Sequence, residues 1–148
     1  MPLQYRHRVL YFTSWGDTAQ IERVSMDGDK ETHIIFYHVE GSWPNCLCLD
    51  FELDALYWID PKKGTIEVVK LHQPLTNHRV VYHAEKHRPY GLAVFEDFAY
   101  WTDWLTEAIH RVNKFTGKQD EKLIEHLYRP MGIAAYHNML QPAGLLLS

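Results

Sequence analysis

Short runs of alternating apolar and polar residues follow one another along most of the 148-residue chain. GLAVFE, AYWTDW and IHRVNKF are examples, and turn residues such as Thr116 and Gly117 separate these runs. A period of two, with aromatic and β-branched residues, predicts strands that bury one face. The stretch DEKLIEHLY has a helical pattern, but its position in the repeat described below predicts a strand. The expected fold class is therefore all-β.

The strand pattern itself repeats. Tyrosines within aromatic runs recur 46 and 43 residues apart, at Tyr11, Tyr57 and Tyr100. Prolines that precede another run recur 45 and 41 residues apart, at Pro44, Pro89 and Pro130. Two independent markers thus keep one period. A period of about 40–45 residues with four short strands is typical of β-propeller blades.

Four runs per period predict four-stranded antiparallel blades, with the proline-led run as the first strand of each. The chain would hold three strands of one blade, two complete blades and a lone first strand at 130–137, which makes twelve strands. We place the partial propeller at 8–142, with repeats at about 8–42, 43–87 and 88–137 and short tails at 1–7 and 143–148. Closed propellers need at least four blades. We therefore expect an open arc, and self-association through its unpaired edges.

Composition narrows the function classes. The net charge of −4 and the pI near 6.2 argue against a nucleic-acid surface, which usually carries a basic stripe. No run approaches the roughly 18 apolar residues of a membrane span, and the first residues lack the pattern of a signal peptide. Cys46 and Cys48 are too far apart along a strand for a relaxed disulfide. We interpret them as buried thiols that pack like small apolar residues.

The segments YWTDW and AIHRVNKFTG, together with WPNCLCLDFELDALYWID, resemble the YWTD (class B) repeats of the low-density lipoprotein receptor family. The resemblance covers roughly residues 8–142 and is nearest to the last three repeats of a six-repeat propeller. YHNMLQP, residues 136–142, resembles the junction that leads into an EGF-like module. The resemblance implies about three of six blades, and we interpret the chain as part of a longer propeller. Ser14, Ile59, Val68 and Cys46 depart from the repeat pattern.

The resemblance implies a non-catalytic protein-interaction module from the extracellular β-propeller of an endocytic lipoprotein-receptor-related receptor. Such a receptor binds and takes up protein ligands and releases them at acidic pH. Protein ligands or neighbouring EGF-like and class A modules would be the partners. The parent would be a type I membrane receptor of the plasma membrane and endosome. Wnt co-receptor-type and nidogen-type matrix-binding propellers remain alternatives.

A propeller hydrolase is the less favoured alternative. Its site needs acids that converge from several first strands. When the three first strands are aligned, however, Asp50, Phe95 and Tyr136 occupy equivalent positions. Those three side chains do not make a metal site. We therefore predict no catalytic residue, no cofactor and no metal site in this chain, and no nucleic-acid partner.

The YWTD-like strands are interpreted as architecture, because their large aromatic side chains would fill the space between blades. Structural roles are predicted for Tyr57, Asp60, Tyr100, Trp101, Asp103 and Arg111. Asp103 lies eight residues before Arg111 across a hairpin, which predicts an ion pair between them. Val68 stands at the matching place after Asp60, so Asp60 is expected to accept hydrogen bonds from backbone N–H groups.

Tryptophans at strand ends are the candidates for binding, because equivalent strand ends should gather at one rim. The predicted protein-binding rim consists of Trp15, Trp43, Trp104, Lys86, His87 and Arg88. Tryptophan and arginine dominate interface hot spots. The same tryptophans could instead close the ends of the blade core. The chain has ten histidines, and His87 could be a structural residue or a pH switch.

Overall fold

The computed structural model describes residues 8–15 and 17–137, which form three antiparallel β-sheets. The first contains β1 (Val9–Trp15), β2 (Ala19–Ser25) and β3 (Ile34–His38), with a 3₁₀ turn at Lys30–Thr32. The second contains β4 (Asn45–Asp50), β5 (Ala55–Asp60), β6 (Thr65–Lys70) and β7 (Arg79–His83). The third contains β8 (Pro89–Phe95), β9 (Phe98–Asp103), β10 (Ala108–Asn113) and β11 (Glu121–Ile124).

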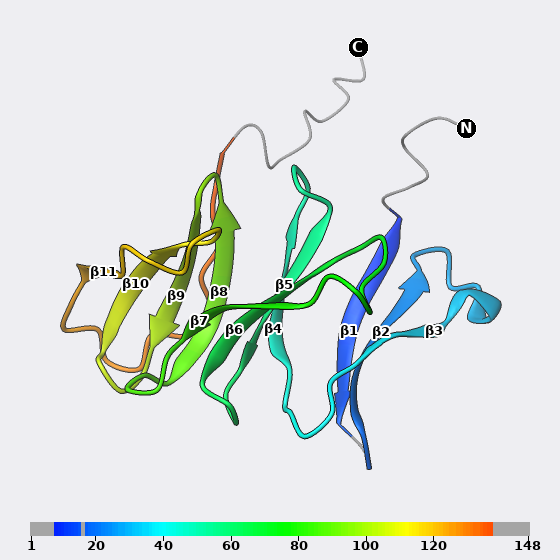
Figure 1. The fold of residues 1–148 in the computed structure, drawn as a ribbon, viewed down its shortest axis with the longest axis horizontal. Coiled ribbons are helices and arrows are strands. Elements are labelled where there is room, and N and C mark those ends of the chain that lie inside the picture. The colour runs from blue at the N-terminus through cyan, green and yellow to red at the C-terminus, as the bar shows by residue number, and fades with distance from the viewer. Residues whose placement is uncertain (1–7, 16, 138–148) are drawn as a thin grey trace.

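Each sheet is a meander, because sequential strands are hydrogen-bonded neighbours. The sheets stand side by side like the blades of a fan (Figure 1), with β4 in contact with both β1 and β8. The prediction of an all-β chain built from partial propeller blades is confirmed. DEKLIEHLY contributes the outer strand β11, as its position in the repeat predicted.

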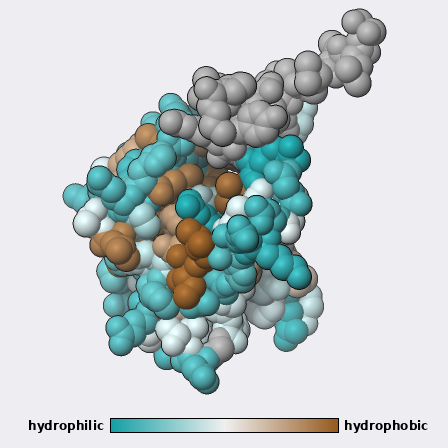
Figure 2. Space-filling model, turned by 90° about the vertical axis from the view of Figure 1, so that its right-hand side faces the viewer, coloured by the Kyte–Doolittle hydropathy of each residue, from teal (hydrophilic) through white to brown (hydrophobic). Residues whose placement is uncertain are grey.

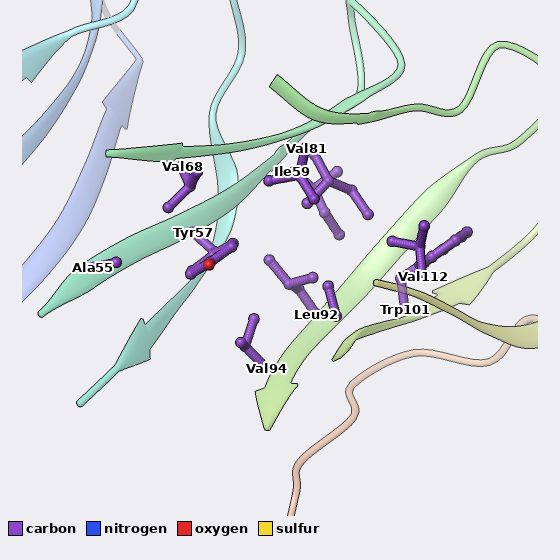
Figure 3. Packing of buried hydrophobic residues seen from close by; sticks show 11 residues of the cluster. Ala55, Tyr57, Ile59, Val68, Val81, Leu92, Val94, Trp101 and Val112 are labelled. Atoms are coloured by element: carbon purple, nitrogen blue, oxygen red, sulfur yellow. The ribbon is translucent and has the colours of Figure 1, made fainter. Parts of the chain in front are cut away.

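The core lies between neighbouring sheets. Tyr57 and Ile59 from β5 meet Leu92 from β8 and the fully buried Trp101 from β9 between the second and third sheets (Figure 3). A second cluster, which includes Trp58, fills the space between the first and second sheets. Successive aromatic residues of one strand therefore bury opposite faces of a blade, which explains why the strand is apolar on both faces.

The predicted twelfth strand at 130–137 is not formed, so the described residues contain eleven strands. A first strand pairs with the second strand of its own blade, and the described residues end at His137, before any such second strand. The segment still lies along the third sheet. Thr102 Oγ1 donates to the Met131 carbonyl at 2.6 Å, and the rings of His137 and Phe95 are 4.9 Å apart.

Close packing of this last segment makes Gly91 sensitive to substitution. A Cβ atom at Gly91 would lie 2.5 Å from the Met131 carbonyl oxygen, whereas a Cβ atom at the repeat-equivalent Gly132 would meet nothing within 4 Å. We expect Gly91→Ala to destabilise the chain by about 1–3 kcal/mol through overpacking. Gly132→Ala is the matched control and should change stability little. Urea unfolding of both variants measures the difference, and equal losses would contradict this packing.

The outer face of the first sheet carries exposed apolar side chains. Leu10, Phe12 and Ile35 are 50%, 37% and 48% exposed, and Figure 2 shows apolar groups on this side of the molecule. Self-association through open blade edges stays a prediction. Within the described residues, no helix has the length and hydrophobicity needed to cross a bilayer.

Candidate functional site

Two exposed tryptophans stack where the first sheet meets the second. The rings of Trp15, at the end of β1, and Trp43, which precedes β4, have centroids 5.9 Å apart and an interplanar angle of 24°. They are 58% and 50% exposed. Trp15 Nε1 donates to the Pro44 carbonyl at 3.1 Å, and Lys62 Nζ lies 5.5 Å from the Trp43 ring centroid. The result is an exposed aromatic surface with an ammonium group over one ring.

A depression of about 600 Å³ adjoins the stacked pair. Besides the two tryptophans, it is lined by Asp17, Glu40 and Lys62. Exposed aromatic rings beside charged groups of both signs suit a protein partner, because such interfaces combine an aromatic anchor with a polar rim.

Trp104 forms a second aromatic site at the end of β9. Its ring stacks on Tyr90 with centroids 4.6 Å apart, and its Nε1 donates to the Pro130 carbonyl at 2.8 Å. This bond repeats the one from Trp15 to Pro44, so each tryptophan ties a strand end to the proline of the next repeat. The tryptophans therefore bond to the edge of the next blade and also remain exposed, and their role in binding stays a prediction.

The rim residues form two sites rather than one. The Trp104 backbone N–H donates to the Arg88 carbonyl at 3.1 Å, which places the exposed Arg88 beside Trp104. Within the described residues, no ring contact or hydrogen bond joins Trp104 to Trp15 or Trp43. Strand directions put both sites at the lower edge of the molecule in Figure 1, with the second sheet between them.

The aspartates of the YWTD-like strands close the turns that follow. Asp103 Oδ1 accepts from the backbone N–H groups of Leu105 and Thr106 at 3.0 and 2.8 Å, and its Oδ2 accepts from the Arg88 N–H at 2.9 Å. Asp60 repeats this arrangement, because its Oδ1 accepts from backbone N–H groups of Lys62, Lys63 and Trp43. Backbone donors at Asp60 were predicted and are confirmed.

The predicted ion pair between Asp103 and Arg111 is wrong. Arg111 lies opposite Tyr100 in the ladder, whereas Asp103 lies opposite Ala108. The Arg111 guanidinium instead pairs with Glu121 of β11 at 2.7 Å and lies 4.3 Å from the Phe98 ring centroid. The register therefore keeps the arginine three residues away from the aspartate along the hairpin.

Sequence comparison identifies the repeat. Residues 97–137 match the model of the low-density lipoprotein receptor repeat class B. This segment contains the YWTD strand β9 and the Asp103 turn. Residues 97–137 therefore carry a class B repeat.

The relatives are longer than this chain. It is 36% identical over 134 residues to vitellogenin receptor Yl of Drosophila melanogaster, which covers 90% of this chain and 6% of that protein. It is 29% identical over 125 residues to the human low-density lipoprotein receptor-related protein 5-like protein, which covers 84% of this chain and 48% of that protein. The chain therefore spans less than half of each.

A solved structure shows the same fold. The structure of a nidogen/laminin complex contains a chain that matches with a TM-score of 0.70 at 24% sequence identity, over 87% of this chain and 48% of that one. The described residues thus adopt the blade arrangement of part of a larger protein. The position of these repeats before an EGF-like module stays a prediction.

His87 does not belong to the exposed rim. Its side chain is only 13% exposed, and its Nδ1 lies 3.2 Å from Asp103 Oδ2. The ring contacts Tyr82, Trp101 and His110. The residue lies in the segment that leads into β8, and these ring contacts hold its side chain inside the blade. Lys86 and Arg88 on either side are exposed.

Buried titratable groups have shifted pKa values. Burial, and then the neighbouring His87, lower the pKa of His110. Burial raises the pKa of Cys46 and raises that of Cys48 to about 11. Both thiols are free and pack against the core cluster, but they are only partly buried, whereas the sequence predicted them buried. They are protonated at neutral pH, and therefore poor nucleophiles.

Some contacts of the repeats were not found from the sequence. The Lys114 ammonium, from the turn after β10, reaches Asp50 at the end of β4 at 2.7 Å, with side chains 1% and 6% exposed. Tyr90, which supports Trp104, follows the repeated proline, and Lys62 follows the repeated aspartate by two residues. The positions of Tyr90 and Lys62 could have been found from the repeat, because each follows a repeated residue. No feature of the repeat indicates that Lys114 pairs with Asp50.

Proposed function

We propose that this chain is a non-catalytic protein-interaction part of the extracellular β-propeller of an endocytic receptor. The stacked, half-exposed pair Trp15 and Trp43 carries the proposal, because it offers an aromatic anchor that the fold does not bury. Similarity to a vitellogenin receptor supports an endocytic parent with a lipoprotein ligand. The parent would be a type I membrane protein, with the rim facing its ligand or its own EGF-like and class A modules.

The rim proposal predicts a loss of binding without a loss of folding. Trp15→Ala combined with Trp43→Ala should weaken binding to vitellogenin, or to a tandem class A and EGF-like module, by at least about 30-fold, because hot-spot residues contribute about 2 kcal/mol or more. Surface plasmon resonance with the immobilised chain measures this. Leu75→Ala is the matched control, because Leu75 is an 81% exposed apolar residue in a different loop.

Binding unchanged in the tryptophan variant, with both probes, would overturn the proposed rim. Circular dichroism of each variant confirms that the sheets persist. The same measurement at neutral pH and at about pH 5.5, where histidines gain charge, tests release at acidic pH. A fall in affinity at the lower pH supports an endocytic receptor, and unchanged affinity favours the Wnt co-receptor-type or matrix-binding alternatives.

The contacts of Asp50, on the first strand of its blade, support the non-catalytic part of the proposal. Asp50 is the acid among the three aligned first-strand positions, and it is already bonded to Lys114 and to the N–H groups of Glu52 and Leu53. A carboxylate with these partners is poorly placed to act as a metal ligand or a base. Metal-dependent esterase or lactonase turnover by the purified chain would contradict this part.

A further inference from the structure

Two histidines and an aspartate converge beside the third sheet. Ligand atoms of His87, His110 and Asp120 all lie within 4.8 Å of one another. His87 lies in the turn before β8, His110 in β10, and Asp120 immediately before β11. The cluster differs from the exposed tryptophan rim because its imidazoles are buried. The side chains of His87 and His110 are 13% and 5% exposed, and that of Asp120 is 37% exposed.

His110 brings an unused ligand atom to this cluster. Its Nε2 is 2.7 Å from Thr106 Oγ1, but its Nδ1 is fully buried and has no hydrogen-bond partner among the described residues. The nearest acid oxygen, Asp120 Oδ1, is 3.5 Å away, which is beyond a good N–H···O bond. A buried polar atom without a partner is rare in folded proteins. It therefore points to a group that completes the cluster.

The other two residues are held in the same way. His87 Nδ1 faces Asp103 Oδ2 at 3.2 Å, which leaves Nε2 as its free nitrogen. Asp120 Oδ2 accepts a hydrogen bond from the Tyr82 hydroxyl, which leaves Oδ1 facing His110. Each of the three side chains thus has an outer partner on one atom and a free atom on the other. Such outer partners orient the ligands in protein metal sites.

We propose that His87, His110 and Asp120 bind a zinc ion, through His87 Nε2, His110 Nδ1 and Asp120 Oδ1. Two imidazole nitrogens and one carboxylate oxygen are typical zinc ligands, and a water molecule would complete the tetrahedron. Zinc–ligand bonds of about 2.0–2.1 Å separate tetrahedral ligand atoms by about 3.4 Å. The 3.5 Å between His110 Nδ1 and Asp120 Oδ1 matches this edge.

The ion would connect the turn that enters the third blade to that blade's two outer strands. This differs from the prediction of no metal site, because the ligands are 23 and 10 residues apart and form no short motif. Their convergence depends on the blade bringing the start of its first strand beside its third and fourth strands. The inference does not depend on the proposed ligand-binding function.

Calorimetric titration of the full chain with zinc chloride, in a buffer that does not chelate metals, tests the site. One zinc ion per chain is expected, with a melting temperature that rises with zinc concentration. Asp120→Asn and His110→Gln should each weaken binding by more than about 100-fold, and Tyr82→Phe, which removes an outer partner, by about 10–100-fold. His72→Gln, an exposed histidine outside the cluster, is the matched control and should bind like the wild type.

Cobalt substitution identifies the ligand type. A tetrahedral visible spectrum without a thiolate charge-transfer band is expected, and it should persist in the Cys46→Ser/Cys48→Ser variant. No saturable zinc binding to the wild type, or equal affinity in Asp120→Asn, overturns the proposal. If His110→Gln does not fold, Asp120→Asn decides alone, because that carboxylate is partly exposed and the substitution keeps its size.

Discussion

Replacing Lys114 by methionine is expected to lower the free energy of unfolding by about 3–5 kcal/mol, because it leaves the Asp50 carboxylate buried without its cation. The two side chains are 1% and 6% exposed, with 2.7 Å between Lys114 Nζ and Asp50 Oδ2. Their elements lie in different sheets, so the ion pair joins the second blade to the third. Urea unfolding followed by tryptophan fluorescence measures the loss.

A double-mutant cycle separates the pair from the packing around it. Asp50→Asn keeps an Oδ1 acceptor for the turn N–H groups of Glu52 and Leu53. Combined with Lys114→Met, it removes both charges. The double variant should therefore recover most of the stability that Lys114→Met loses.

Lys122→Met, in the exposed pair of Lys122 with Glu125, is the control and should change stability little. A small effect of Lys114→Met, close to that of this control, would contradict the interpretation of a buried inter-blade pair.

This ion pair also marks the limit of prediction from sequence. The period of the tyrosine and proline markers predicted the blades, because a repeat of four short strands in about 40–45 residues is typical of a propeller blade. It did not predict which polar groups meet between blades. Lys114 and Asp50 are 64 residues apart and occur at different places in the repeat. Their contact follows from the three-dimensional offset between neighbouring sheets, which periodicity alone does not give.

The tryptophan sites show what position in the repeat can predict. Trp15 and Trp43 lie at strand ends that meet at one edge, so their stacking follows from the strand order. Trp104 lies at the same place in the third sheet, two blades after Trp15. In the blade between them, the equivalent strand ends in Asp60-Pro61 and has no tryptophan. A proline at that place has no indole to extend the aromatic surface. The rim is therefore interrupted at the middle blade.

His87 was misplaced for a different physical reason. Its neighbours Lys86 and Arg88 are charged and exposed, and sequence alone gave no sign that the residue between them turns inward. His87 lies two residues before the buried Pro89, and the exposed Arg88 stands between them. Contacts with Trp101 and His110 then exclude most of the solvent from the ring.

Replacing Asp103 by alanine is expected to lower the free energy of unfolding by more than about 3 kcal/mol. The carboxylate is fully buried and accepts from three backbone N–H groups, those of Arg88, Leu105 and Thr106. Each buried donor left without a partner costs about 1–3 kcal/mol. Asp103→Asn, which keeps one oxygen acceptor, should lose less.

Arg111→Ala distinguishes this role from the ion pair expected from the sequence. The Arg111 guanidinium contacts Glu121 at the surface, and surface pairs contribute little to stability. We therefore expect little change in urea unfolding for Arg111→Ala and a large loss for Asp103→Ala. Equal losses in the two variants would restore the ion pair. Unequal losses would show that the aspartate of the YWTD strand stabilises the blade by closing its own turn and holding the entry of the first strand.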